Sequence, residues 1–319
     1  MKRRHILRIA ACGVLPGLAA RASAQTKPLT IVVGYGPGSS VDLVARRTAE
    51  RLGPALKRTV LVENKPGAGG QLALTAIAAG PADGSLIAFT APAPLTIFPA
   101  TYDRLPYDPK DFVAIGATCS VEAGFVVGNA HPAKTMTEFL KWAKDHACTI
   151  GNPGHATGPH FNVWQLAKAS GIEVEHVPYR TIPQLALEVA NGQLSAGFSA
   201  MPAFMELIKA GRLRLLATAG NRRAQLFPQV PTFVELGYDK VRAEDWYGFV
   251  ASVRIPQPFR TEFADALHQI SKEPEYREAI VAMGLIPEYQ DAPTLAQRIK
   301  ADTAKWTELG KLTGFKSTS

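Results

Sequence analysis

Several glycine-rich loops in this sequence follow apolar runs, and their backbone N–H groups and nearby hydroxyls could bind a ligand. The first is residues 34–38 (GYGPG), which follow the apolar run Leu29–Val33 and precede Ser39 and Ser40. A strand, a glycine-rich loop and a helix start leave backbone N–H groups unpaired at the positive end of the helix dipole. The pattern predicts an anion-binding site, and an ordinary strand-to-helix turn is the alternative.

Similar loops rich in Gly, Pro, Ser or Thr recur at 91–94, 151–159, 178–181 and 199–202. Each lies between a predicted strand and a predicted helix. Ligands of open α/β sheets bind beyond the carboxyl ends of the strands, so the loops are expected to share one cleft. One helix N-terminus contributes about 0.3–1 kcal/mol, whereas micromolar affinity needs about 8 kcal/mol. Direct hydrogen bonds and two domains closing on the ligand are expected to supply the rest.

The candidate ligand-binding residues come from these loops and the helix starts after them. They are Tyr35, Gly36, Pro37, Gly38, Ser39, Ser40, Asp42, Ala91, Pro92, Ala93, Asn152, Gly154, Ala156, Thr157, His160, Tyr179, Arg180, Thr181, Ser199 and Ala200. Arg180 could supply a cation to an anionic ligand or be a solvated arginine at a helix start. Tyr35 could form a wall of the site or pack under its loop.

Nucleotide chemistry fits these residues less well. Gly34 and Gly36, with Glu63 at the end of the next strand, imitate a dinucleotide fingerprint, but Ser39 stands at its third glycine position. The loop at 65–70 lacks the Gly-Lys-Ser/Thr of a P-loop. No nucleotide cofactor is therefore predicted.

Hydrolysis and metal binding also have weak support. The chain has no G-x-S-x-G elbow, so helix capping and ligand hydrogen bonding are the preferred roles of Ser39 and Ser40. His155 and His160 have no run of carboxylate ligands beside them, so structural hydrogen bonds are preferred to a metal site.

Strands and helices alternate along the chain, which predicts an α/β fold. Over the first three strands, up to residue 90, the alternation implies a parallel sheet with right-handed crossovers. Predicted strands are 29–33, 59–64, 86–90, 113–119, 123–127, 149–150, 174–177, 194–198, 213–219 and 245–250. Predicted helices begin at 39–40 and 202 and span 71–79, 95–100, 135–146, 159–169, 182–190, 232–236, 256–270, 274–283 and 292–310.

Length and charge exclude some classes of protein. The chain has 319 residues, which suits two domains better than one. Its net charge is +8, but residues 1–24 carry five basic residues and no acid, and the rest has 30 basic and 27 acidic residues. A nucleic-acid partner therefore has little support.

Residues 1–24 have the pattern of a signal peptide: a basic start, a short apolar stretch and small residues before a cleavage site after Ala24. Arg3 and Arg4 leave Sec and Tat export both open. No later run is long and apolar enough to span a membrane, so an exported, periplasmic protein is expected. There, Cys119 and Cys148 could pair or could be two small buried side chains.

Several motifs resemble one known family along nearly the whole mature chain. They are 37–46 (PGSSVDLVAR), 62–70 (VENKPGAGG), 83–84 (DG), 105–112 (LPYDPKDF), 177–180 (VPYR) and 230–237 (VPTFVELG). The resemblance is to the Bug family of periplasmic solute receptors, the binding components of tripartite tricarboxylate transporters. It implies a two-domain periplasmic binding protein, type II-like, which closes like a flytrap with crossing strands as its hinge. Domain 1 would be 26–124 plus 248–319, and domain 2 would be 125–247.

The same resemblance implies a monomeric receptor without catalysis, cofactor or metal. Its ligand would be a di- or tricarboxylate, an acidic amino acid or an aromatic acid, and its partner a two-component membrane permease. Ser39, Thr181, Trp164 and residues 94–96 depart from the family pattern and leave the ligand open. The alternative is an exported α/β enzyme, a Rossmann-like oxidoreductase or a hydrolase, that uses the same cleft.

Overall fold

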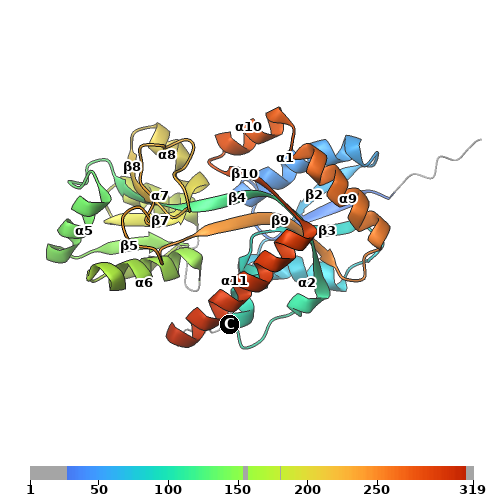
Figure 1. The fold of residues 1–319 in the computed structure, drawn as a ribbon, viewed down its shortest axis with the longest axis horizontal. Coiled ribbons are helices and arrows are strands. Elements are labelled where there is room, and N and C mark those ends of the chain that lie inside the picture. The colour runs from blue at the N-terminus through green and yellow to red at the C-terminus, as the bar shows by residue number, and fades with distance from the viewer. Residues whose placement is uncertain (1–26, 154–156, 180, 314–319) are drawn as a thin grey trace, which may run out of the picture.

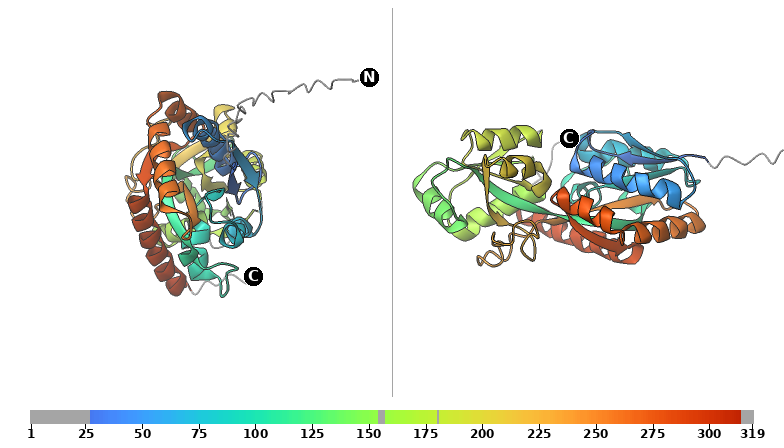
Figure 2. Two further views of the ribbon diagram at one scale, coloured as in Figure 1. Left: turned by 90° about the vertical axis from the view of Figure 1, so that its right-hand side faces the viewer. Right: turned by 90° about the horizontal axis from the view of Figure 1, so that it is seen from above.

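The computed structural model describes residues 27–153, 157–179 and 181–313, which form two α/β lobes lying side by side (Figures 1 and 2). The predicted signal peptide, residues 1–24, lies outside these residues. Two strands run from one lobe to the other: β4 (Phe112–Gly128) and β9 (Glu244–Ser252). They pair antiparallel, so the two lobes share one sheet.

Lobe one contains both the first and the last elements of the chain. Its other strands are β1 (Leu29–Val33), β2 (Val60–Asn64), β3 (Leu86–Thr90) and β10 (Ile286–Asp291). Its helices are α1 (Ser40–Ala55), η1 (Ala68–Gly70), α2 (Gln71–Ala79), α3 (Ala93–Thr96), α4 (Phe98–Thr101), η2 (Pro109–Asp111), α9 (Gln257–Ile270), α10 (Pro274–Ala282) and α11 (Ala292–Thr313).

Lobe two is formed by the middle of the chain. Its other strands are β5 (Thr149–Asn152), β6 (Glu175–Pro178), β7 (Ala196–Ala200) and β8 (Leu213–Thr218). Its helices are α5 (Met136–Asp145), α6 (Gly158–Ser170), α7 (Ile182–Ala190), η3 (Met201–Ala203) and α8 (Met205–Lys209). Within the described residues the strand order is β2-β1-β3-β9-β4-β7-β5-β6, with β8 and β10 also paired to β4. The predicted two-lobed α/β fold is confirmed.

Burial on both faces explains why β1 reads as a continuous apolar run. Ile31 and Val33 pack with the core on the side of α1, while Val32 packs with the core on the side of α2. A parallel strand covered by helices on both faces has no polar side, so alternation disappears from its sequence. β1 lies between β2 and β3 and is parallel to both, as the strand–helix alternation predicts.

The prediction of two strands at 113–119 and 123–127 is wrong, because β4 is one strand of 17 residues. The polar residues Ser120 and Glu122 suggest a break in the sequence. Both are buried in the structure, where β4 passes between its neighbours. In lobe one β4 pairs with β9 and β10, and in lobe two it pairs with β7 and β8. The proposed domain boundaries near 124 and 248 fall inside β4 and β9 and stay predictions.

Three smaller differences separate prediction and structure. Residues 232–236 form turns instead of a helix, the predicted helix at 95–100 is split into α3 and α4, and β10 was not predicted. Cys119 and Cys148 are buried free thiols in the cores of different lobes. Of the two alternatives, a disulfide and two small buried side chains, the structure has the second. Within the described residues, no helix combines the length and the apolar character needed to cross a membrane.

Candidate functional site

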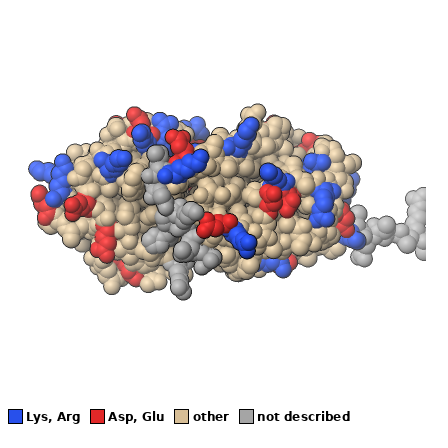
Figure 3. Space-filling model, turned by 90° about the horizontal axis from the view of Figure 1, so that it is seen from below, with Lys and Arg blue, Asp and Glu red and all other residues tan. Residues whose placement is uncertain are grey.

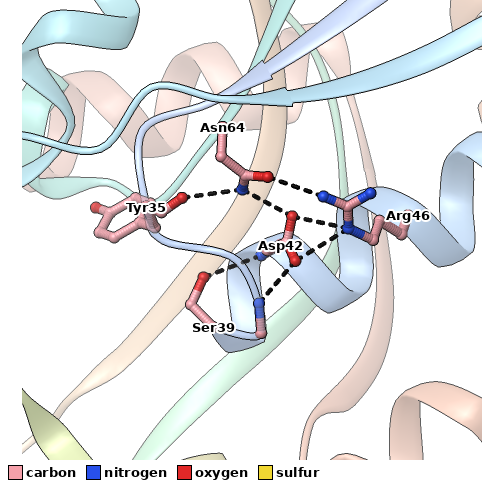
Figure 4. Close-up of polar contacts among 6 residues, drawn as sticks. Tyr35, Ser39, Asp42, Arg46 and Asn64 are labelled. Carbon is pink, nitrogen blue, oxygen red and sulfur yellow. Dashed lines mark hydrogen bonds and ion pairs between the residues drawn. The ribbon is translucent and has the colours of Figure 1, made fainter.

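The loop between β1 and α1 is held by one buried carboxylate, that of Asp42 (Figure 4). It accepts a hydrogen bond from the amide of Gly38 at 2.8 Å, from Nδ2 of Asn64 at 2.8 Å and from Nε of Arg46 at 3.1 Å. Asn64 Nδ2 also donates to the carbonyl of Tyr35 at 3.0 Å, and Arg46 Nη2 donates to Oδ1 of Asn64 at 2.8 Å. These bonds fix the loop to the end of the neighbouring strand β2.

The charge on Asp42 is stabilised within this cluster. Burial alone raises the pKa of a carboxyl group, but the hydrogen bonds from Arg46, Gly38 and Asn64 outweigh it and hold the pKa of Asp42 below its ordinary value. Because its carboxylate is bonded to the loop and negatively charged, we assign Asp42 a positioning role. The prediction that it contacts the ligand itself stays untested.

The backbone amides at the start of α1 differ in whether they can donate a hydrogen bond to an anion. Gly38 N–H is used by Asp42, Ser39 N–H donates to the carbonyl of Gly36, and Asp42 N–H donates to Oγ of Ser39, the N-cap of α1. Within the described residues, the amides of Ser40 and Val41 make no hydrogen bond. They therefore are the N–H groups that this helix start offers to an anion.

The glycines of the loop have different functions. A Cβ on Gly34 would lie 2.6 Å from Cα of Gly70, so the first glycine lets two backbones approach each other. A Cβ on Gly36 or Gly38 would meet nothing within 4 Å, but Gly38 has φ +80°, which side chains disfavour. Only Gly36 thus combines open space with an ordinary backbone.

Three of the predicted loops converge on the core of lobe one. Tyr35, Ala91 and Ala200, each from a different loop and the last from lobe two, pack against the same apolar cluster. A fourth loop leads into α6, whose Phe161 packs on Trp306 of α11 at 5.3 Å between ring centroids. Ala93 packs against that pair, so α6 meets the loop after β3. Helix α11 thereby joins the lobes a second time.

Several of the remaining predicted residues belong to lobe two, where they are buried, cap a helix or bond to side chains of the same lobe. Asn152 and Ser199 are buried, and Thr157 caps α6 by accepting the His160 amide at 3.4 Å. Tyr179 packs within lobe two and donates a hydrogen bond from its hydroxyl to Glu188. Thr181 precedes α7 without a side-chain capping bond. Gly154, Ala156 and Arg180 lie outside the described residues, as does His155.

Two tyrosines beside the loop, Tyr35 and Tyr247, pack against the core of lobe one. Tyr35 lies against Gly70, with ring atoms 3.8 Å from a Cβ placed there. Burial and the nearby carboxylate of Asp245 raise the pKa of its hydroxyl. Tyr247 contacts Ser40, with 2.9 Å between the two hydroxyl oxygens. Pro37 stays exposed at the loop tip, and Pro92 is buried where it caps α3.

Sequence reasoning missed four residues of this arrangement: Arg46, Asn64, Asp245 and Tyr247. Asn64 had a usable signal, because it ends the strand beside β1 and so must lie at the same edge of the sheet. The other three depend on side-chain directions in α1 and on the pairing of β9, which local spacing does not give.

Two pockets that are open to solvent lie away from these loops. One of about 600 Å³ opens between α9, β10 and the start of α11, and one of about 290 Å³ lies between residues 222–227 and 281–286. Neither contains a candidate residue, so we base the site on the loop amides and their convergence. Within the described residues no cluster of His, Cys, Asp and Glu could hold a metal ion. Lys, Arg, Asp and Glu are interspersed on the face seen in Figure 3.

Comparison with known proteins gives one family. The family described as tripartite tricarboxylate transporter family receptor matches residues 44–315. The UPF0065 protein in the gbd 5' region of Cupriavidus necator is 33% identical over 317 residues, covering 96% of this chain and 95% of that protein. Protein BugT of Bordetella pertussis is 26% identical over 307 residues and covers 94% of both chains.

Solved structures share the fold. The periplasmic binding protein BugD has a TM-score of 0.80 at 25% identity, covering 92% of this chain and 99% of its own. A protein of R. palustris solved with adipate has a TM-score of 0.84 at 22% identity, covering 91% and 98%. MatC from Rhodopseudomonas palustris with bound malate has a TM-score of 0.77 at 22% identity, covering 88% and 98%. At 22% identity the last two show the fold alone.

Proposed function

The chain belongs to the family of tripartite tricarboxylate transporter receptors, and on that premise we propose that it binds a small carboxylate at the start of α1. The family resemblance seen in the motifs is confirmed. The observation that carries the proposal is the pair of amides of Ser40 and Val41, to which no other part of the described chain is hydrogen-bonded, at the N-terminus of a 16-residue helix. A carboxylate placed there would accept two hydrogen bonds at the positive end of the helix dipole.

Rigidity of the loop supports this proposal. The bonds of Asp42 to Gly38, Arg46 and Asn64 hold the loop before any ligand arrives, so binding orders little additional backbone. The convergence of Tyr35, Ala91 and Ala200 on one cluster supports a site closed from both lobes. The second lobe would contribute residues from the starts of α6 and α7.

The wider role follows from the family. We propose a monomeric receptor that works in the periplasm after cleavage behind Ala24 and delivers its ligand to a two-component membrane permease. The division into 26–124 plus 248–319 and 125–247 describes the two bodies that would close on the ligand. Adipate and malate, found with similar folds, are the first carboxylates to try.

A thermal-shift panel tests the proposal. The purified protein is heated with malate, adipate, citrate, glutamate, benzoate, NAD or phosphate, each at millimolar concentration. A ligand at 100 times its Kd raises the free energy of unfolding by about 2.7 kcal/mol, which is a clear shift. We expect one class of carboxylate to raise the Tm. A shift with NAD alone would overturn the proposal in favour of the exported enzyme.

Turnover separates the receptor from an enzyme that uses the same cleft. The carboxylate that raises the Tm is incubated with the protein in molar excess and recovered by chromatography. A receptor binds it in a one-to-one ratio and returns it unchanged. Conversion of more than one equivalent contradicts the proposal.

A further inference from the structure

Glu122 lies on β4 at the point where this strand passes from one lobe to the other. Its side chain is 2% exposed. Glu244 of β9 is its direct partner in the antiparallel pair. Two acids opposite each other repel when both are ionised, so one of them is expected to hold a proton more easily than the other.

The two acids differ in their hydrogen bonds. Glu244 accepts a bond from Nδ2 of Asn221 at 2.9 Å, which supports its charge. Oε2 of Glu122 is buried, and within the described residues no well-aligned hydrogen bond reaches it. The buried hydroxyl Oγ1 of Thr218 lies close to Glu122 and is likewise without a well-aligned partner there. Glu122 is therefore the acid whose charge this conformation supports least.

The elements packed around Glu122 carry charged groups of both signs. β9 presents Glu244, and the segment after β8 presents Arg222 and the backbone of Gly220. Arg223 of the same segment also lines the cavity and is paired with Glu235 at 2.8 Å. On the side of β10, Glu288 bonds to Ser120 and lies 3.9 Å from Arg298 of α11. Segment 281–286 presents only Val281, Ala282, Met283, Gly284, Leu285 and Ile286, none of which titrates.

The balance of these groups favours the neutral acid. Burial is the main cause that raises the pKa of Glu122, to about 7, and Glu244 raises it further. Thr218, Gly220 and Arg222 lower it in part. A pKa raised this far lets the carboxyl group change its protonation near neutral pH.

Glu122 also lines a space whose walls belong to different lobes. This cavity of about 290 Å³ is bounded by residues 222–227 from lobe two and by Val281 and residues 284–286 from lobe one. A rotation of one lobe against the other must change the distance between these walls. The water that can reach Glu122 therefore depends on the angle between the lobes.

We propose that Glu122 is a proton-operated latch of the hinge. With its proton the carboxyl group can stay buried without an unpaired charge, so the described arrangement of the lobes is favoured. When it releases the proton to solvent, the charge is stabilised by water, and arrangements with a wider cavity become favoured. By linkage, lobe movement and proton uptake drive each other. This inference concerns the hinge and does not depend on which ligand the protein binds.

Small-angle scattering of the ligand-free protein between pH 5.5 and 8.5 tests the latch. We expect the radius of gyration to change with a midpoint near pH 7. Glu122→Gln should keep the low-pH value throughout, because the amide cannot ionise. Glu288→Gln, the matched control on the neighbouring strand, should respond as the wild type does.

A second variant keeps the test valid if Glu122→Gln does not fold. Thr218→Val removes the hydroxyl that lowers the pKa of Glu122, so the midpoint should move to higher pH. A purely structural role of Thr218 would leave the midpoint in place. A flat wild-type profile, an unchanged response in Glu122→Gln or an unmoved midpoint in Thr218→Val would each overturn the proposal.

Discussion

The carboxylate of Asp42 lies 2.8 Å from the amide of Gly38, four residues earlier, and this bond closes the β1–α1 loop on its own helix. It also removes Gly38 N–H from the donors available to a ligand. The anion site thereby moves from the glycines to the amides of Ser40 and Val41. The acid shapes the site although its own charge would repel a carboxylate.

Removal of the Asp42 carboxylate should loosen this loop. Asp42→Ala leaves Gly38, Arg46 and Asn64 without their acceptor, and we expect a loss of about 2–3 kcal/mol in the free energy of unfolding. Carboxylate affinity should fall at least about tenfold, an estimate that corresponds to 1.4 kcal/mol. Urea denaturation and titration calorimetry measure the two effects. Glu50→Gln, an exposed acid on the same helix, is the control, and equal losses in both variants would contradict the role of Asp42.

The amide of Ser40 can be deleted without breaking the helix. Ser39 has ψ 156°, an extended conformation that proline tolerates in its predecessor, and proline is favourable at the first helical position. We expect Ser40→Pro to keep the Tm within a few degrees and to lose carboxylate binding. Ser40→Ala removes the same hydroxyl but keeps the N–H group, so it should retain most affinity. Equal affinity in the proline and alanine variants would move the anion site elsewhere.

Gly34 and Gly36 form a matched pair that separates packing from binding. In Gly34→Ala the new Cβ would lie 2.6 Å from backbone Cα of Gly70, which forces β1 and η1 apart. We expect a loss of about 1–3 kcal/mol in the free energy of unfolding, the usual cost of overpacking. Gly36→Ala meets nothing within 4 Å and should fold normally. Thermal denaturation of both variants decides, and equal Tm values would show that the close approach relaxes at no cost.

Asp245 should make stability depend on pH. Burial and then repulsion from Asp302 raise its pKa to about 6, although Lys305 and Arg298 act in the opposite direction. The folded state disfavours the charged form of Asp245. The destabilisation by Asp245 therefore grows as the pH rises from the pKa of the unfolded chain, near 4, to the pKa of the folded protein, about 6, and is constant above that. Asp245→Asn should therefore raise the free energy of unfolding by about 1–3 kcal/mol at pH 7.5 and change it little at pH 4.

Urea titrations of wild type and Asp245→Asn at these two pH values measure this difference. The exposed Asp239→Asn is the control and should show no pH-dependent change. A stabilisation by Asp245→Asn that is as large at pH 4 as at pH 7.5 would show that packing, and not charge, is the cause.

The local features of the site could be predicted from the sequence. An apolar run, glycines and Ser39 fix a strand, a turn and a capped helix through contacts between residues a few positions apart. The motif at 62–70 also placed Asn64 at the end of the adjacent strand. These signals suffice for the family, the α/β fold and the position of the first loop, because near neighbours decide them.

The partner that each of the following residues contacts depends on the tertiary structure. Gly34 faces Gly70, Ser40 faces Tyr247, and Glu122 faces Glu244, and all of these partners are distant in the sequence. For the same reason β4 reads as two strands in the sequence but is one in the structure: its polar middle is buried by elements from both lobes. Polarity and spacing describe a residue alone, whereas its burial, free hydrogen-bond donors and pKa depend on the neighbours that folding brings to it.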